Sequence, residues 1–440
     1  MRIFLSFATE DFTTPEHDAV LLRLAEIMRA RGICGCFHVT GDIVRHWRRA
    51  ASSPIVSALA AHELGYHTNT HGAYPFVGEV CTGRSWTEAV QELLLSEGRG
   101  LQDVREFFGR MPVYYVTEFS FAPQLMYAMK LLGLEVLGLS GLPGQGRPFC
   151  RYMQSICYTG PHQGLELPFQ AGRLDQMKQE FDRHYQQGDA MLKLFNHPYK
   201  FVYNNNISSW VSVNNLYQGY DLRRNWCEAT AGKYPAAVRE QLLGDFAALL
   251  DYVLEHQDVQ FVSTTEAAAA ARLPRPGKIS RRDLAGLPTA IAPAWNLSPA
   301  ELFGLLVRAM LCDHDLLSTR PLLGPVGNTA LPLTGPLSLP LAAVREALAQ
   351  LDREMDYRTQ LPAAWEISGR LLSPADIWRG MLGWLRQPAE MVTFLPGEQE
   401  PEIARQEYFA RRTWTRDIYP VGFTGEELCA ANRRQSWTWA

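Results

Sequence analysis

Short apolar runs alternate with amphipathic helical stretches over residues 1–272, and this alternation constrains the fold more than any other feature. Runs of strand length occupy residues 2–7, 33–39, 113–117, 135–139, 190–195 and 259–263. The helical spacing of apolar residues predicts helices at residues 18–31, 54–61, 87–109, 123–132 and 236–256. Because strands that alternate with helices generally pair in parallel, the pattern predicts an α/β domain.

A second domain is expected after a proline-containing linker, which reads LPRPGK at residues 273–278. Beyond it, residues 285–440 are rich in leucine, alanine and proline, which predicts a smaller helix-rich domain. Ser298, Ser338 and Ser373 are predicted helix N-caps, two of them followed by proline. Their spacing fits weak internal repeats of one small domain, but it fits the ordinary residue preferences of helix starts equally well. The sequence assigns this domain no function.

Composition excludes several classes of protein. The formal charge of −4 and the scattered basic residues argue against nucleic-acid binding, and no apolar run reaches the length of a membrane span. The start MRIFLSF is too short for a signal peptide, and none of the eight cysteines forms a C-x-x-C pair. We therefore expect a cytoplasmic protein with reduced cysteines. Its oligomeric state cannot be read from the sequence.

Two histidines, His67 and His71, stand four residues apart in the run HELGYHTNTH at residues 62–71. On one side of a helical turn, this spacing would let both imidazoles reach one metal ion. The other interpretation is a pair of ordinary surface or core histidines, because a bare His-x-x-x-His also arises by chance among eleven histidines.

Acidic residues and a third histidine strengthen the metal interpretation. Glu10 and Asp11 follow the first predicted strand, and His197 ends a later strand before Pro198. The carboxyl ends of parallel strands meet at one edge of a sheet or barrel, so these side chains are expected near the histidine pair. A carboxylate with two histidines leaves coordination positions open for water and substrate, as in a catalytic zinc site.

Several segments, in the same order along the chain, resemble the motifs of the polysaccharide deacetylases (the NodB-homology domain, carbohydrate esterase family 4). The histidine run is similar to their zinc-binding motif and is the most specific match. The other similar segments read CFHVTG at residues 36–41, FAP at 121–123, LELP at 165–168, LFNHP at 194–198 and FVSTTE at 261–266. The resemblance covers about residues 1–272.

The resemblance implies a distorted parallel (β/α) barrel of about seven strands. It implies metal-dependent hydrolysis of an N-acetyl group on an amino-sugar glycan or glycan precursor, hence a carbohydrate partner. His67 and His71 would be metal ligands and His197 the general acid. Zinc is the expected metal, with cobalt and nickel as alternatives.

The first motif departs from the family pattern, which commonly reads Thr-Phe-Asp-Asp, with a base followed by a metal ligand. In strict register, Ala8 and Thr9 occupy the two acid positions. In a second alignment, to relatives that read Asp-x-Glu-Asp, Asp11 would be the metal ligand and Glu10 a substitute base. A polar turn without catalytic function is the third interpretation of these two acids.

The third motif also departs, because Phe121 stands where the family usually has an arginine that orients the base. Three functions therefore remain open. The leading one is a metal-dependent deacetylase, and the second is a catalytically degenerate relative that binds carbohydrate or a protein partner. A hydrolase acting on a non-sugar amide is a third candidate.

Overall fold

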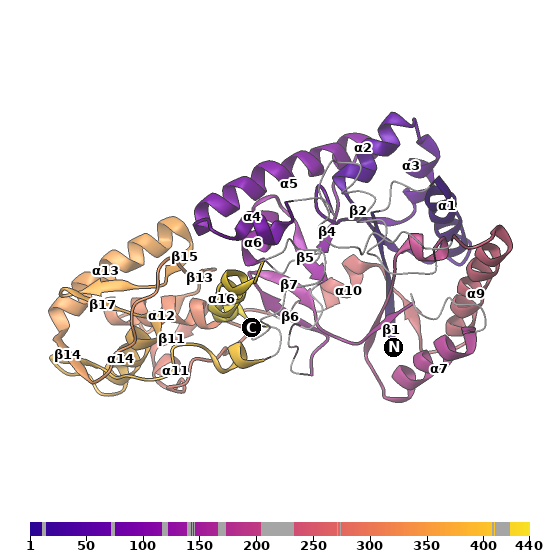
Figure 1. Ribbon diagram of the computed structural model, residues 1–440. Helices are drawn as coiled ribbons and strands as arrows, with labels where there is room; N and C mark the ends of the chain where they lie inside the picture. Colours follow the sequence, from indigo (N-terminus) through magenta and orange to yellow (C-terminus); the bar gives the residue numbers. More distant parts are fainter. Residues whose placement is uncertain are drawn as a thin grey trace.

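The protein was analysed as a computed structural model (Figure 1). It describes residues 1–440 except 11–14, 72–74, 117–121, 139–141, 143, 145, 166–172, 204–232, 271, 273, 407–408 and 410–422.

A ten-stranded sheet forms the centre of the N-terminal part. Its first strand, β1 (Arg2–Thr9), lies between β2 and β9 and pairs with both in parallel. The strand order is β6-β7-β5-β4-β3-β2-β1-β9-β8, with β10 also pairing with β1, and the β6–β7 hairpin is antiparallel. The other strands are β2 (Cys36–Val39), β3 (Glu63–Tyr66), β4 (Tyr114–Val116), β5 (Glu135–Gly138), β6 (Phe149–Tyr152), β7 (Ser155–Tyr158), β8 (His162–Gly164), β9 (Met191–Asn196) and β10 (Gln260–Phe261).

The sheet curls into a barrel. Phe4 on β1 and Tyr158 on β7 are separated by four strands in the sheet order, yet their rings meet edge to face with centroids 5.0 Å apart. Tyr114, Phe149 and Met191 from β4, β6 and β9 join the same buried cluster. Side chains from such distant strands can share one cluster only if the inner face of the sheet is concave. The expected distorted parallel (β/α) barrel is therefore confirmed.

Helices cover the outside of the barrel (Figure 1). They are α1 (Pro15–Arg29), α2 (Gly41–Arg49), α3 (Ser53–Leu59), α4 (Val77–Cys81), α5 (Trp86–Phe108), α6 (Pro123–Leu131), α7 (Leu174–Gln186), α9 (Ala236–Leu254) and α10 (Thr264–Ala270), with a 3₁₀ turn η1 (Pro198–Phe201). The longest of them, α5, begins with a capping box between Ser85 and Glu88 and ends at Gly109, whose φ of 68° suits glycine. The apolar helix faces and the outer face of the sheet form one large core cluster.

The C-terminal part has its own hydrophobic cluster. Its described residues form five α-helices and four two-stranded sheets, so the expected helix-rich region also contains short strands. The elements are β11 (Lys278–Ser280), α11 (Arg281–Ala285), α12 (Pro299–Leu311), β12 (Leu316–Ser318), β13 (Leu323–Val326), β14 (Leu337–Pro340), α13 (Leu341–Arg358), β15 (Gln360–Pro362), β16 (Trp365–Ile367), β17 (Arg370–Leu372), α14 (Pro374–Arg386), β18 (Met391–Phe394), η3 (Glu402–Arg405), α16 (Glu426–Gln435) and η4 (Ser436–Thr438). The boundary at residues 273–284 stays a prediction.

The last residues return to the barrel. Ala440 pairs with Arg151 on β6 through two backbone hydrogen bonds of 2.7 and 2.8 Å. Trp439 packs in the barrel core, whereas Trp437 packs in the C-terminal cluster. Both tryptophans are buried, so they join the two cores.

Two of the three predicted serine caps are correct. Ser298 and Ser373 accept hydrogen bonds from the first turns of α12 and α14, each with proline at the start of the helix. Ser338 is different, because it lies within β14 and pairs with Thr393 on β18. The helix that follows begins only at Leu341. The N-cap prediction is therefore wrong at Ser338, and the weak internal repeats stay a prediction.

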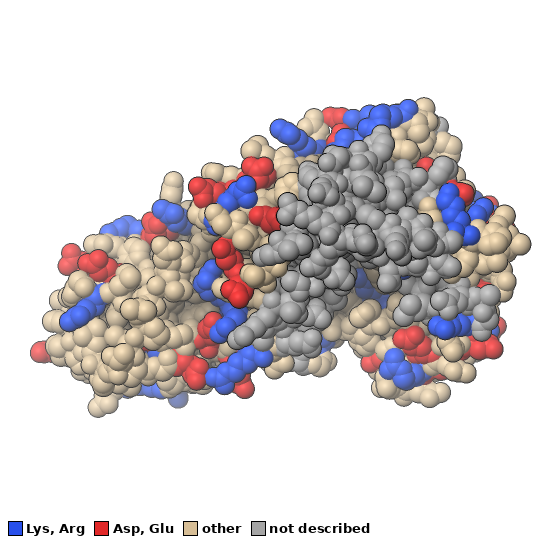
Figure 2. Space-filling model, viewed as in Figure 1, with Lys and Arg blue, Asp and Glu red and all other residues tan. Residues whose placement is uncertain are grey.

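Charges are mixed on the surface. On the face drawn in Figure 2, acidic and basic side chains are interspersed over the described residues, without an extended basic area. Among the described residues, no helix is both long and apolar enough to cross a membrane.

Candidate metal centre

Glu10 enters the barrel at the carboxyl end of β1. Side chains alternate along a strand, so Phe4, Ser6, Ala8 and Glu10 share the inner face on which Phe4 meets Tyr158. Glu10 is 1% exposed. A carboxylate in this position is removed from water, which is costly unless other groups compensate its charge.

His67 and His71 come from the loop that follows β3. The backbone N–H of His67 still donates to Val39 on β2, which fixes the start of this loop. Thr68 then adopts a φ of 66°, and residues 67–71 form a loop with no helical turn. The predicted helical turn is therefore wrong, but the loop brings the two imidazoles together, with ring centroids 4.3 Å apart.

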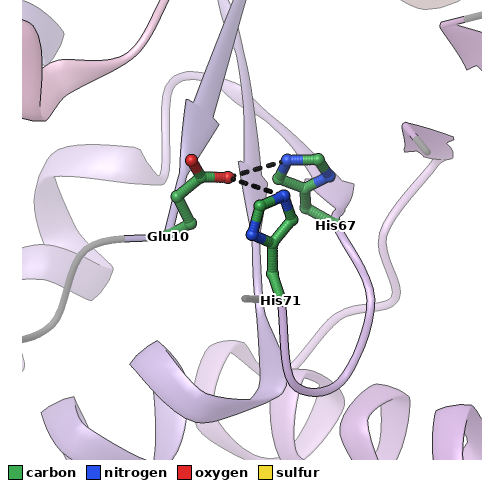
Figure 3. A group of neighbouring side chains, drawn as sticks. All are labelled: Glu10, His67 and His71. Carbon is green, nitrogen blue, oxygen red and sulfur yellow. Dashed lines mark ion pairs between the residues drawn. The ribbon is translucent and has the colours of Figure 1, made fainter. Parts of the chain in front are cut away.

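The three side chains converge on one point (Figure 3). Nε2 of His67 lies 2.8 Å and Nε2 of His71 lies 3.4 Å from Oε2 of Glu10. One ligand atom from each residue falls within 4.8 Å of the others, and all three residues are buried. This is the one such group of histidine, cysteine or acidic residues found in the described part of the chain.

His197 completes the surroundings of Glu10 from the opposite side. It follows β9, which pairs with β1 on the side away from β2. Its Nε2 lies 3.4 Å from Oε1, the other oxygen of Glu10. The ring is 8% exposed and packs against Phe195 and Tyr199. The carboxylate is thus bordered by three imidazoles.

The charge of Glu10 depends on these histidines. Burial by itself raises the pKa of the carboxyl group, but the positive charges that His71, His197 and His67 can carry lower that pKa to about 2. Neither oxygen of Glu10 reaches a described residue in hydrogen-bond geometry. Buried carboxylate oxygens normally have such partners, so a buried carboxylate with imidazole nitrogens at 2.8–3.4 Å fits a site for a shared cation.

A second set of residues holds the histidine loop. The carboxylate of Glu97 on α5 accepts hydrogen bonds of 2.8 Å from the backbone N–H of Asn69 and from the hydroxyl of Tyr66. Arg45 on α2 donates to the Asn69 side chain at 2.8 Å. The sequence analysis did not identify Glu97. The signal available was an acidic residue inside the apolar stripe of a long helix, and Glu97 is indeed only 3% exposed.

A further histidine, His38, lies inside the barrel near the candidate metal centre. His38 on β2 is fully buried, and neither of its ring nitrogens reaches a described residue in hydrogen-bond geometry. It lies level with Ala8 on β1 and Gly65 on β3. A Cβ at Gly65 would stand 1.9 Å from Nδ1 of His38, so only glycine leaves room for this ring.

The remaining predicted residues divide into two groups. Asp11 and Phe121 lie outside the described residues, so their predicted roles stay predictions. Ala8 is buried on the inner face of β1 and offers no ligand atom. His62, the first histidine of the motif, is structural: its Nδ1 accepts from the backbone of Gly35, and its Nε2 lies 3.0 Å from the carbonyl of Ala25.

No protein-family model matches this chain, and no curated protein sequence matches it. Solved structures do. A protein from Mycobacterium smegmatis described as a candidate polysaccharide deacetylase is 16% identical, with a TM-score of 0.40 over 62% of this chain and 94% of that one. A family 4 acetyl xylan esterase from Clostridium thermocellum, solved with a cobalt ion, is 14% identical, with a TM-score of 0.33 over 62% and 93%. A family 4 pseudoenzyme from Bacillus anthracis is 12% identical, with a TM-score of 0.33 over 61% and 65%.

Proposed function

We propose that this chain is a polysaccharide-deacetylase-like hydrolase that uses a divalent metal to remove N-acetyl groups from an amino-sugar glycan or glycan precursor. The observation that carries the proposal is the buried group of Glu10, His67 and His71, whose ligand atoms lie within 4.8 Å of one another. A carboxylate with two histidines is a donor set that zinc uses in catalytic sites. Cobalt and nickel bind similar sets.

We propose Glu10 as the carboxylate ligand, in place of the base role that the sequence comparison suggested. The distances support this change, because Oε2 of Glu10 lies 2.8 and 3.4 Å from the two histidine nitrogens. Asp11 remains the alternative ligand. When bound, the metal would polarise the acetyl oxygen and lower the pKa of a coordinated water.

His197 is proposed to protonate the leaving amine. Its Nε2 faces the site, 3.4 Å from Oε1 of Glu10, so a proton held at Nε2 lies beside the group that binds the metal. A histidine suits this step because its ordinary pKa lies close to neutral pH.

The second candidate function is a catalytically degenerate relative that binds carbohydrate or a protein partner. Ala8 favours it, because the inner face of β1 carries a methyl group where the family resemblance leads us to expect an acidic base. An Ala8→Asp variant separates the two candidates. If it gains turnover that the parent protein lacks, the natural site is degenerate, and if it gains none while the parent is active, the degenerate interpretation fails.

The proposal is tested by measuring bound metal and acetate release. Purified protein is analysed for zinc, cobalt and nickel, and then incubated with acetylated chito-oligosaccharides and a panel of acetylated sugar nucleotides. We expect near-stoichiometric metal and hydrolysis, both lost in His67→Ala. His314→Ala is the matched control, because this histidine is exposed in the C-terminal part.

Two results would contradict the proposal in different ways. If the protein holds no metal at stoichiometric level and takes none up, the metal site fails. If it binds metal tightly but releases no acetate from any substrate, the deacetylase activity fails while the metal site stands. A cytoplasmic location remains part of the proposal.

A further inference from the structure

A separate cavity lies where the barrel, the linker and the C-terminal part meet. Its volume is about 310 Å³, and it is lined by residues of the β6–β7 hairpin together with Arg272, Arg275 and Asn296. This volume lies at the lower end of the range of small-molecule pockets, ~300–1,000 Å³. The cavity is distinct from the metal centre, because it shares none of the residues of that centre.

Four arginines line this cavity: Arg147, Arg151, Arg272 and Arg275. Two carboxylates lie near enough to pair with them. Glu301 pairs with both Arg151, at 3.4 Å, and Arg275. Glu135 pairs with Arg272, at 3.5 Å, and with Lys130 as well. The positive charges at this cavity therefore exceed the negative charges.

The carboxylate of Glu301 is also committed elsewhere. It accepts a hydrogen bond of 2.9 Å from the backbone N–H of Ser298 in the capping box of α12. The oxygens of Glu301 therefore interact both with the first turn of α12 and with two guanidinium groups. Burial lowers the pKa of Arg275 despite the opposing charge of Glu301, and nearby Arg151 lowers it further. The positive charge of Arg275 is therefore incompletely compensated.

No described residue compensates the positive charge of Arg147. Its guanidinium group makes no ion pair or hydrogen bond with any residue that the structure describes, although its side chain is only partly exposed. A guanidinium group presents several N–H donors in a planar fork that matches the oxygens of a phosphate or carboxylate. A guanidinium group without a described partner, in a positively charged cavity, is suited to binding an anion.

The rest of the lining is suited to a small hydroxylated molecule. Phe149 and Ile156 provide apolar walls, and the side-chain amide of Gln154 makes no hydrogen bond with a described residue. An amide offers both a donor and an acceptor, which matches hydroxyl groups. An apolar wall beside such groups matches the face of a sugar ring.

We propose that this cavity binds the phosphate monoester of a small polyhydroxylated molecule, such as a sugar phosphate, with Arg147 as the main phosphate contact. Gln154 contacts the hydroxyl groups, and Phe149 and Ile156 contact the ring. Residues from the barrel, the linker and the C-terminal part all line this cavity. A ligand in it links these parts and stabilises their junction.

The test is isothermal titration calorimetry of the full-length protein with glucose 6-phosphate, inorganic phosphate, glucose and citrate. We expect saturable binding of glucose 6-phosphate, weaker binding of inorganic phosphate and citrate, and no binding of glucose. In Arg147→Gln, the Kd for glucose 6-phosphate should rise by about tenfold or more, which is the loss of one charge-assisted contact. In Gln154→Ala, the Kd should rise less, while that for inorganic phosphate stays unchanged.

The matched control is Arg353→Gln, which removes an exposed arginine without a described partner from α13. Its Kd should equal that of the parent protein, and circular dichroism should show all variants folded. The proposal is overturned if glucose 6-phosphate does not bind saturably, if glucose or citrate binds as tightly, or if Arg147→Gln and Arg353→Gln have equal affinity. Because the metal centre is untouched, zinc content should be the same in every variant.

Discussion

Nε2 of His67 lies 2.8 Å from Oε2 of Glu10, although the strands that precede these residues are not neighbours in the sheet. Strand β2 lies between β1 and β3. The two side chains therefore meet above the end of β2, which itself contributes no member of the cluster. A metal bound here would connect the ends of β1 and β3, and single substitutions should show which side chains bind it.

Glu10→Gln should abolish tight zinc binding, because an amide keeps the size of the side chain but loses the charge that a cation requires. We expect the zinc content of the purified variant to fall far below one ion per chain, measured by elemental analysis. Glu92→Gln, on the exposed face of α5, is the control and should retain its zinc. If instead Glu10→Gln keeps its zinc and Asp11→Asn loses it, the ligand is Asp11.

Replacing Glu97 should weaken the metal site without touching a ligand. Glu97→Ala removes the acceptor for the Asn69 N–H and the Tyr66 hydroxyl, so the loop that carries His67 and His71 loses its anchor. We expect an increase of about tenfold in the Kd for zinc, measured by competition with a chromophoric chelator. The buried groups left without partners should also cost about 2–4 kcal/mol of unfolding free energy in urea.

A conservative substitution of Glu97 shows whether this residue positions the loop that carries His67 and His71 or only fills space. Glu97→Gln keeps one side-chain oxygen that can accept from Asn69, so it should recover part of the zinc affinity. Glu92→Ala on the same helix should change neither the Kd for zinc nor the free energy of unfolding. Equal zinc affinity in Glu97→Ala and the parent protein would show that the loop holds its shape without this carboxylate.

The alternation of strands and helices made most of the barrel predictable from the sequence. The predicted strand at residues 190–195 corresponds to β9 (Met191–Asn196), and the predicted helix at 87–109 corresponds to α5. Other elements were missed, including α2, α7 and the short β6–β7 hairpin. Both helices bury an apolar face, but charged residues separate their few apolar positions, so the helical spacing is hard to recognise in the sequence.

For the candidate metal centre, the sequence predicted the two histidines but did not decide between Glu10 and Asp11 as the carboxylate. Spacing identified His67 and His71, yet their convergence depends on a left-handed residue, Thr68, that no local pattern indicates. Strand alternation favours Glu10 over Asp11. Glu10 is an even number of residues away from Phe4 and Ala8, so its side chain points to the same inner face of the barrel. The role of Glu97 depends on packing of α5 against β3, which is a tertiary contact.

Gly65→Ala should destabilise the barrel through His38. The added Cβ would overlap Nδ1 of His38, which has no room to move inside the packed interior. We expect a loss of about 1–3 kcal/mol in unfolding free energy, measured by urea denaturation. The double variant Gly65→Ala/His38→Ala should lose less than the sum of the two single variants, because the second change removes the clash.

Gly98→Ala provides a control of opposite sign. Gly98 lies inside α5, and a Cβ there would meet only Leu132, at a distance of 3.9 Å. Alanine is the better helix former, so this variant should be more stable by about 0.5–1 kcal/mol. If both glycine variants change stability in the same direction, the clash with His38 does not govern Gly65.

A lysine in the barrel wall makes the stability of the protein depend on pH. Lys193 on β9 is partly buried, with its ammonium group 4.9 Å from the ring centre of Phe195. Burial lowers the pKa of Lys193 to about 8, against an opposing contribution from Cys36. The unfolded chain keeps the ordinary lysine pKa of ~10.4, so between these values it binds more protons than the folded chain. The cost of burying the charge is therefore complete below pH 8 and disappears as pH rises toward 10.4.

Lys193→Met should stabilise the protein at pH 7 by about 1–3 kcal/mol, because the variant has no charge to bury. The advantage over the parent protein should shrink steadily between pH 8 and about 10.4, since the parent then folds with a neutral amine. Urea denaturation of both proteins across this range measures the difference. Lys278→Met, an exposed site on β11, should show no such convergence. A constant difference between Lys193→Met and the parent from pH 7 to 10.4 would mean that packing, and not the buried charge, sets the effect.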